Sequence, residues 1–247
     1  MKICRFLKDN RIQLGIVEGD EIWVCDADLR KTDELWYFDE VEILAAAAPS
    51  KVVCVGRNYA DHAKELGNEV PVEPLLFLKA PSAIIGHGDV IEIPPQSQQV
   101  EHEGELAVVI GARCKNIADD DVPFKYVLGY TCLNDVTARD VQRKDVQFTR
   151  GKSFDTFCPI GPYIETELDV SNLRVTTTVN DELKQDGRTS QMVFPVDFLI
   201  RYISRQMTLN AGDVIATGTP SGVSQMKSGD ICKVTIEGVG TLSNKVE

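Results

Sequence analysis

Short apolar runs that end at tight turns dominate this chain, and that pattern constrains its fold more than any other feature. Near the amino terminus, residues 3–7, 13–17 and 21–24 form three such runs, and turn-forming Asp, Asn and Gly residues separate them. Only residues 196–207 place apolar side chains at clear helical spacing. Strands outnumber helices and do not alternate with them, so the sequence predicts a β-rich α+β fold rather than a parallel α/β fold.

The chain divides into two parts near residue 50. Residues 1–50 are predicted to form a small β domain, with a weakly helical stretch at residues 39–48 that ends at Pro49 and Ser50. Residues 51–247 are predicted to form the main domain, which begins with a buried strand at residues 52–55 and a helix over residues 59–66 capped by Asn58. Further strands are expected at residues 106–110, 231–237 and 241–246, the last two as a terminal hairpin.

Charge and cysteine usage argue against several classes of protein. The formal net charge of −12 argues against nucleic-acid binding, which needs a basic face. The seven cysteines include no CxxC pair, which argues against a zinc or redox motif and fits a reducing compartment. The sequence shows neither a signal-peptide pattern nor an apolar run long enough to cross a bilayer. We therefore expect a cytoplasmic protein with no nucleic-acid partner and no membrane partner.

Several common catalytic motifs are missing. The Gly86-His87-Gly88 segment lacks the third glycine of a dinucleotide fingerprint, and the chain contains no P-loop. The segment at residues 218–222 has its serine one place too late for a nucleophile elbow. These features argue against hydride transfer, nucleotide hydrolysis and serine-type acyl transfer.

Two glutamates stand at the start of an apolar run. Because side chains alternate along a strand, Glu103 and Glu105 point to the same face, roughly 6–7 Å apart. At an effective dielectric constant of 20 their repulsion is about 2.5 kcal/mol, which a hard cation such as Mg²⁺ or Mn²⁺ would convert into attraction. The alternative is a solvated strand end without a metal. Asp135 supplies a third carboxylate after the apolar run at residues 126–133, and its alternative role is a helix cap paired with Arg139.

Three other polar residues carry weaker signals. His62 and Glu65 lie three residues apart on the predicted helix, so the carboxylate can orient the imidazole. Lys152 stands beside a glycine in an aromatic-rich loop. Taken alone, each residue fits a solvated surface position at least as well as a functional one.

Six segments together resemble the fumarylacetoacetate hydrolase family. In the expected order, they are residues 53–61 (VCVGRNYAD), 76–81 (LFLKAP), 103–111 (EGELAVVIG), 135–142 (DVTARDVQ), 152–159 (KSFDTFCP) and 216–223 (ATGTPSGV). The resemblance implies a mixed β-sandwich roll with a small amino-terminal β domain, usually assembled as a homodimer.

The resemblance also implies roles for individual residues. The family's carboxylates for Mg²⁺ or Mn²⁺ match Glu103, Glu105 and Asp135. Its catalytic residues match His62, Glu65, Gln142 and Lys152, and its substrate-binding residues match Arg57, Arg139 and Thr219. Val55 stands where the namesake enzyme has a further aspartate, which argues against a full-sized fumarylacetoacetate pocket.

The implied substrate is a small 2-oxo acid, whose adjacent carboxylate and ketone oxygens can chelate one metal ion. The ion would polarise the ketone and stabilise the enolate that forms when the C3–C4 bond breaks. Acylpyruvate hydrolysis and oxaloacetate decarboxylation both form that enolate. We expect such C–C cleavage because His62 backed by Glu65 can activate water. One alternative is isomerisation of an unsaturated 2-hydroxy or 2-oxo diacid in aromatic catabolism, as in 2-hydroxyhepta-2,4-diene-1,7-dioate isomerases. The other is a metabolite-binding module without catalysis.

Overall fold

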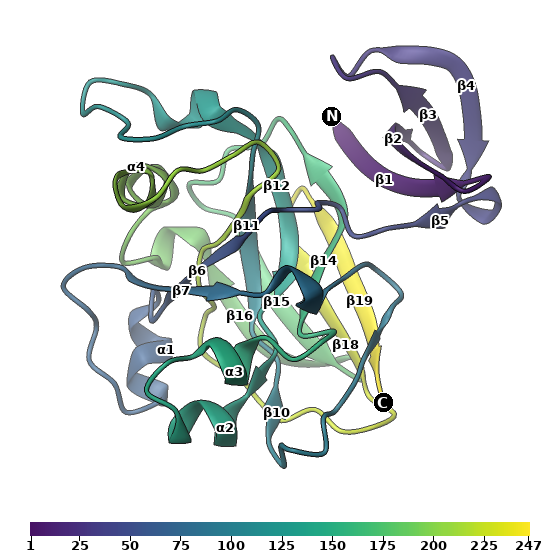
Figure 1. Cartoon of the computed structure of the whole chain (residues 1–247). Coiled ribbons are helices and arrows are strands. Elements are labelled where there is room, and N and C mark those ends of the chain that lie inside the picture. Colours follow the sequence, from purple (N-terminus) through teal and green to yellow (C-terminus); the bar gives the residue numbers. More distant parts are fainter.

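The computed structural model describes all 247 residues, and most of its regular structure is strand (Figure 1). One mixed sheet contains twelve strands: β1 (Lys2–Lys8), β2 (Arg11–Glu18), β3 (Glu21–Cys25), β4 (Lys31–Tyr37), β5 (Glu42–Ile43), β6 (Val52–Gly56), β7 (Leu75–Lys79), β8 (Ile84–Ile85), β11 (Gly104–Ile110), β12 (Val127–Asn134), β14 (Cys158–Glu165) and β17 (Val214–Ala216). A second sheet contains five strands: β9 (Val90–Ile91), β15 (Arg174–Val179), β16 (Glu182–Arg188), β18 (Ile231–Ile236) and β19 (Gly240–Val246). The remaining elements are the strand pair β10 (Val100–Glu101) and β13 (Thr137–Ala138), and the helices α1 (Ala60–Glu65), α2 (Arg139–Lys144), α3 (Thr149–Lys152) and α4 (Val196–Gln206). The predicted β-rich α+β fold is confirmed.

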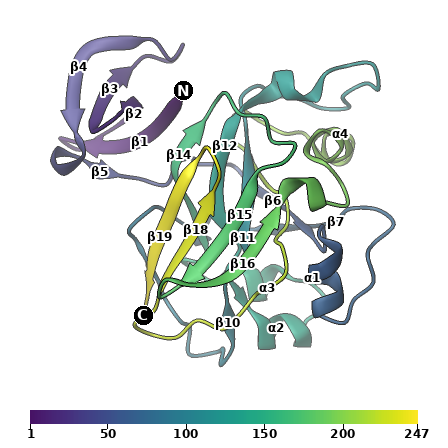
Figure 2. The same ribbon diagram turned by 180° about the vertical axis from the view of Figure 1, so that it is seen from behind.

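The two sheets pack face to face as a sandwich. The first sheet follows the order β4-β3-β2-β1-β14-β12-β11-β17-β6-β7, and the second follows β16-β15-β18-β19-β9. Strands β11, β12 and β14 lie against β15, β18 and β19, as the view from behind shows (Figure 2). Most neighbouring strands are antiparallel, whereas β6 with β17, β8 with β14 and β9 with β19 are parallel.

Strand β11 is buried on both faces. Leu106 and Val108 belong to the apolar cluster that includes side chains of β18 and α4, whereas Ala107 and Val109 belong to the cluster on the opposite face. Burial on both sides explains why this strand reads as a continuous apolar run rather than an alternating one.

The amino-terminal strands form a small lobe at one side of the sandwich (Figure 1). A core of their own includes Cys4, Phe6 and Ile22. Strand β1 also pairs with β14 through Lys2 and Ile3, so the first sheet runs continuously from this lobe into the sandwich.

Two local predictions are wrong. The helix expected at residues 39–48 is absent, because Phe38–Glu40 form a short 3-10 helix and β5 follows. Beyond β5, the Ala46 N–H donates to the Ile160 carbonyl at 3.3 Å, so contacts with a distant strand override the helical preference of the alanines. Asn58 does not cap α1, since Tyr59 stands at the cap position. The Asn58 amide instead donates to the carbonyls of Thr217 and Phe194.

The helices are short. The longest, α4, has eleven residues, and a helix that spans a bilayer needs about 20 apolar ones, a length that none of the helices reaches. All seven cysteines are buried and unpaired. The predicted terminal hairpin is present as β18 and β19.

Candidate metal centre and active-site pocket

Three carboxylates converge where two central strands meet. Glu103 immediately precedes β11, Glu105 lies within it, and Asp135 follows β12. In the antiparallel register Gly104 lies opposite Asn134, which brings Glu103 beside Asp135. Two hydrogen bonds fix that approach: the Asp135 N–H donates to the Glu103 carbonyl at 2.8 Å, and the Glu103 N–H donates to Asn134 Oδ1 at 2.9 Å.

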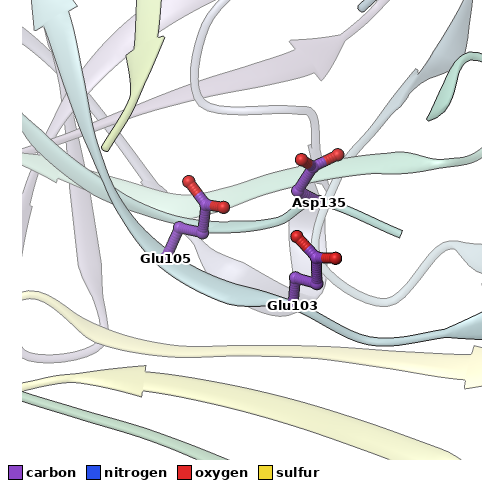
Figure 3. Close-up of side chains that lie close together, drawn as sticks. All are labelled: Glu103, Glu105 and Asp135. Carbon is purple, nitrogen blue, oxygen red and sulfur yellow. The ribbon is translucent and has the colours of Figure 1, made fainter. Parts of the chain in front are cut away.

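The three carboxylates point toward one another (Figure 3). One oxygen of each lies within 4.8 Å of the others. Glu103, Glu105 and Asp135 are only 4%, 2% and 1% exposed, so the alternative of a solvated strand end is wrong. The alternative of Asp135 as a helix cap paired with Arg139 is also wrong, because Arg139 binds other carboxylates.

The glycine between the two glutamates allows the strand to pass close to the second sheet. A Cβ on Gly104 would lie 2.1 Å from Thr177 Oγ1 and 3.2 Å from a methyl group of Val234. Because side chains alternate along a strand, packing Gly104 against the second sheet directs Glu103 and Glu105 to the opposite face.

Three buried cations surround the acidic group. Lys152 donates to Glu103 Oε2 at 2.8 Å and to Asp135 Oδ2 at 2.7 Å, so its alternative as a surface lysine is wrong. Arg139 donates to Glu103 Oε1 at 2.5 Å. Lys79, at the end of β7, donates to Asp135 Oδ1 at 2.5 Å and to the Val136 carbonyl at 3.1 Å. Lys79 was not among the predicted site residues, although residues 76–81 carry part of the family resemblance.

Glu105 differs from its two neighbours because no cation binds it. It accepts one hydrogen bond, from the Gly218 N–H at 2.7 Å. Burial, together with repulsion from Asp135 and Glu103, raises the pKa of Glu105 well above its usual range. Burial also opposes ionisation of Glu103, but nearby cations, chiefly Lys152, outweigh it and hold the Glu103 pKa well below its usual range.

This donor set fits a hard divalent cation. Three carboxylates offer the oxygen ligands that Mg²⁺ and Mn²⁺ prefer. Glu105, buried and without a cation of its own, is the group that such an ion would compensate. Glu103, Glu105 and Asp135 are therefore the residues that could hold the metal.

A cavity of about 280 Å³ opens above the carboxylates. That volume lies just below the ~300–1,000 Å³ of sites for drug-sized ligands and suits a small metabolite. Nine of the ten predicted site residues line it: Arg57, His62, Glu103, Glu105, Asp135, Arg139, Gln142, Lys152 and Thr219. The tenth, Glu65, lies behind His62.

His62 enters the pocket from α1. Its side chain is buried, so a solvated surface position is wrong for this residue, and its Nδ1 lies 3.3 Å from Glu65 Oε2. The turn before α1 contains Arg57 with φ of 58°, a left-handed conformation that is uncommon for a residue other than glycine. Asn58 holds this turn through its bonds to Thr217 and Phe194, and the turn directs the chain along the pocket wall.

The pocket's other polar side chains differ in how many hydrogen bonds and ion pairs they form within the protein. Arg139 donates to Glu101, to Glu103 and to Gln142 Oε1. The Thr219 hydroxyl donates to the Gly104 carbonyl at 2.9 Å. Arg57 and Arg143 also line the pocket, and neither forms an ion pair with a carboxylate of the protein. Arg143 was not among the predicted site residues, and its position directly after Gln142 is the only sign of it in the sequence.

Two sequence profiles match the chain. One described as Fumarylacetoacetate (FAA) hydrolase C-terminal covers residues 51–247, and one described as Rv2993c-like, N-terminal covers residues 1–45. The chain belongs to the fumarylacetoacetate hydrolase family. The resemblance inferred from the six segments is thereby confirmed.

Relatives with named activities include tautomerases and isomerases. Oxaloacetate tautomerase YisK of Bacillus subtilis is 42% identical, over 94% of this chain and 84% of its own length. The human mitochondrial oxaloacetate tautomerase FAHD2A is 46% identical, over 84% of this chain and 70% of its own length. Among solved structures, 5-carboxymethyl-2-hydroxymuconate delta-isomerase from Mycobacterium smegmatis superimposes with a TM-score of 0.92. Its sequence is 40% identical, and the match covers 100% of this chain and 99% of the isomerase chain. These family members are named as enzymes.

Proposed function

We propose that this protein is a divalent-metal-dependent enzyme that interconverts the keto and enol forms of a small 2-oxo diacid of the oxaloacetate type. The observation that carries the proposal is the buried group of Glu103, Glu105 and Asp135 at the base of a small pocket that His62 also lines. The names of the oxaloacetate tautomerases and of the muconate isomerase support an isomerase over the C–C cleavage expected from the sequence.

The charges around the site favour an anionic ligand once a divalent ion is present. The carboxylates of Glu101, Glu103, Glu105 and Asp135 and the cations Lys79, Arg139 and Lys152 leave a formal charge of −1. A divalent ion held by the three carboxylates would change this to +1 and would polarise the ketone of a bound 2-oxo acid. A net positive, buried site then attracts the substrate carboxylate.

Two arginines support a substrate with a second carboxylate. Arg57 and Arg143 line the pocket without a carboxylate partner, whereas Arg139 and Lys152 are engaged by Glu101, Glu103 and Asp135. An arginine that meets a carboxylate forms a strong, charge-assisted hydrogen bond. We therefore assign the distal carboxylate of the substrate to the side of the pocket formed by Arg57 and Arg143.

His62 is the proposed group for proton transfer at C3. Since Nδ1 faces Glu65, Nδ1 carries the hydrogen that Glu65 accepts, and Nε2 is left free to take a proton. In the keto-to-enol direction, Nε2 removes a proton from C3 and the electron pair of that C–H bond forms the C2–C3 double bond. The π electrons of the C2–O double bond move onto the C2 oxygen, which then takes the proton from Nε2, so that His62 is neutral again. The reverse sequence gives back the ketone.

C–C cleavage is the second candidate, and the same pair of residues favours it. A neutral His62 held by Glu65 could activate a water molecule beside the substrate, as acylpyruvate hydrolysis requires. Both reactions share the enolate, so product analysis is needed to separate them.

The test follows oxaloacetate by proton NMR and by the ultraviolet absorbance of its enol. Wild-type protein with Mg²⁺ should accelerate keto–enol exchange, and EDTA should abolish the acceleration until Mg²⁺ or Mn²⁺ is restored. Glu105→Gln should weaken Mg²⁺ binding in calorimetry, whereas the matched change at the exposed Glu182 should not. His62→Ala should bind Mg²⁺ normally but lose roughly 10²–10⁴ in rate. Full activity in rigorously metal-free buffer would contradict the proposal, and release of pyruvate in step with enolisation would favour the cleavage reaction.

A further inference from the structure

The loop after β17 contacts the acidic group at one end and α1 at the other. At its start, the Gly218 N–H donates to Glu105 Oε2 at 2.7 Å. Four residues later, the Gly222 N–H donates to the carboxylate of Glu65, with oxygens at 3.0 and 3.2 Å. Glu65 is also the residue that contacts the His62 imidazole. One short segment of backbone therefore touches a candidate metal ligand and the partner of the candidate base.

Gln185 fixes the middle of this loop to the strand that carries the glutamates. Its side-chain amide donates to Thr219 Oγ1 and to the Pro220 carbonyl, both at 2.7 Å. Its oxygen accepts the Gly104 N–H at 2.9 Å and faces His102 Nδ1 at 3.1 Å. Gln185 is completely buried, so all of its hydrogen bonds are made within the protein. The loop is thus held rigidly against the start of β11.

Both glycines of the loop adopt conformations that other residues rarely adopt. Gly218 has φ of +99° and Gly222 has φ of +101°. A Cβ at Gly222 would lie 2.0 Å from the Lys184 carbonyl oxygen, which is backbone and cannot rotate away. The conformation that directs the Gly222 N–H toward Glu65 therefore depends on glycine.

Helix α1 has few other polar attachments. It has six residues and no side-chain bond at its amino-terminal cap, so it is too short to be stable in isolation. Among its side chains only His62 and Glu65 make hydrogen bonds, and only Glu65 makes one to the rest of the protein. Glu65 is partly exposed, so its orientation depends on this bond rather than on tight packing.

We propose that the Gly222 N–H is the group that positions Glu65, and through Glu65 the His62 imidazole, relative to the carboxylates at the other end of the loop. Gly222 is thus a positioning residue, because it touches neither the pocket nor the metal ligands. The effect on turnover rests on the function proposed above, whereas the effect on the orientation of His62 does not.

The first test compares Gly222→Ala with Gly229→Ala. Gly229 has a similar φ of +93°, but a Cβ there meets nothing within 4 Å, so the control carries the backbone strain without the collision. The chain has three histidines, so imidazole signals in ¹H–¹⁵N spectra are few, and His62→Ala assigns the relevant ones. In Gly222→Ala the His62 signals should move and broaden, while those of His87 stay unchanged. The Kd for Mg²⁺ should remain within about twofold of the control, and kcat should fall about tenfold or more at nearly constant KM.

His62 signals that superimpose in the two glycine variants would overturn the proposal, whether or not the protein turns over oxaloacetate. If Gly222→Ala does not fold, amide hydrogen exchange in unaltered backbone gives the second test. The Gly222 N–H should exchange at least about tenfold faster in Glu65→Met than in wild type, because the substitution removes its acceptor. Equal exchange rates would overturn the proposal, and faster exchange confined to Gly222 and α1 would support it.

Discussion

Replacing Lys79 with methionine removes a charge from the interior with little change in side-chain length. Lys79 is 1% exposed, and its ammonium group binds Asp135 Oδ1 and the Val136 carbonyl. Loss of one partner from a buried ion pair costs about 3–5 kcal/mol, because a desolvated charge remains without compensation. Asp135 keeps Lys152 on its other oxygen, so we expect the lower end, about 3 kcal/mol. For a chain of this length that corresponds to a fall in Tm of roughly 6–12 °C.

The assay measures the Tm in EDTA, first without added metal and then with Mg²⁺ added in excess over the EDTA. Lys245→Met is the matched control, since Lys245 pairs with Glu247 at the surface and its loss should change Tm by less than about 2 °C. In Lys79→Met the formal charge of the buried group becomes −2 instead of −1, so Mg²⁺ should raise its Tm by more than it raises the Tm of wild type. A Tm for Lys79→Met within 2 °C of the control would refute the reasoning about burial. A larger Mg²⁺ effect on wild type than on the variant would refute the reasoning about charge.

Two further predictions concern selectivity and pH. Arg143→Met should raise the KM for oxaloacetate about tenfold or more and leave the KM for a 2-oxo monoacid within about twofold. The control Lys144→Met changes the next residue of α2, which lies outside the pocket, and should alter neither KM. Equal effects of Arg143→Met on the diacid and the monoacid would contradict the role of Arg143. Burial lowers the pKa of His102 below its usual value. The His102 imidazole therefore takes up a proton at higher pH in the unfolded chain than in the folded protein. The free energy of unfolding should decrease as the pH falls from 7.5 through 6.5 toward the pKa of His102 in the folded protein. Urea unfolding at pH 7.5 and 5.5 should show a smaller loss in His102→Gln than in wild type, and an equal loss would show that His102 does not carry this dependence.

The side-chain alternation of strands made part of the site predictable. Once residues 104–110 form a strand, side-chain alternation places Glu103 and Glu105 on one face of the sheet. The same alternation places Gly104 on the opposite face, against the second sheet. The position of Asp135 at a strand end followed in the same way from the apolar run before it. The family resemblance then supplied the residues of α1, α2 and α3, for which spacing alone was ambiguous.

Contacts between residues distant in sequence could not be predicted from local patterns. Lys79 reaches Asp135 only because β7 pairs with β6 and β6 pairs with β17, which places it under the acidic group. The alanines near residue 46 have a helical preference, but the hydrogen bond from Ala46 to Ile160 ties this segment to β14 in an irregular conformation. Arg139 likewise donates to Glu101 and Glu103 through tertiary contacts, which the spacing of residues along α2 does not reveal.

The carboxylates at the base of the pocket and the residues at its rim belong to different kinds of structure. Glu105 stands on β11, and Glu103 and Asp135 directly adjoin the buried ends of β11 and β12, whereas Arg143 and Phe148 lie on or beside short helices at the pocket rim. Mutations at the rim should therefore change which ligand the pocket accepts without disturbing the sheet beside which the carboxylates lie. Such a separation would let a few substitutions at the rim redirect the proposed chemistry to another small anion while the carboxylates stay in place.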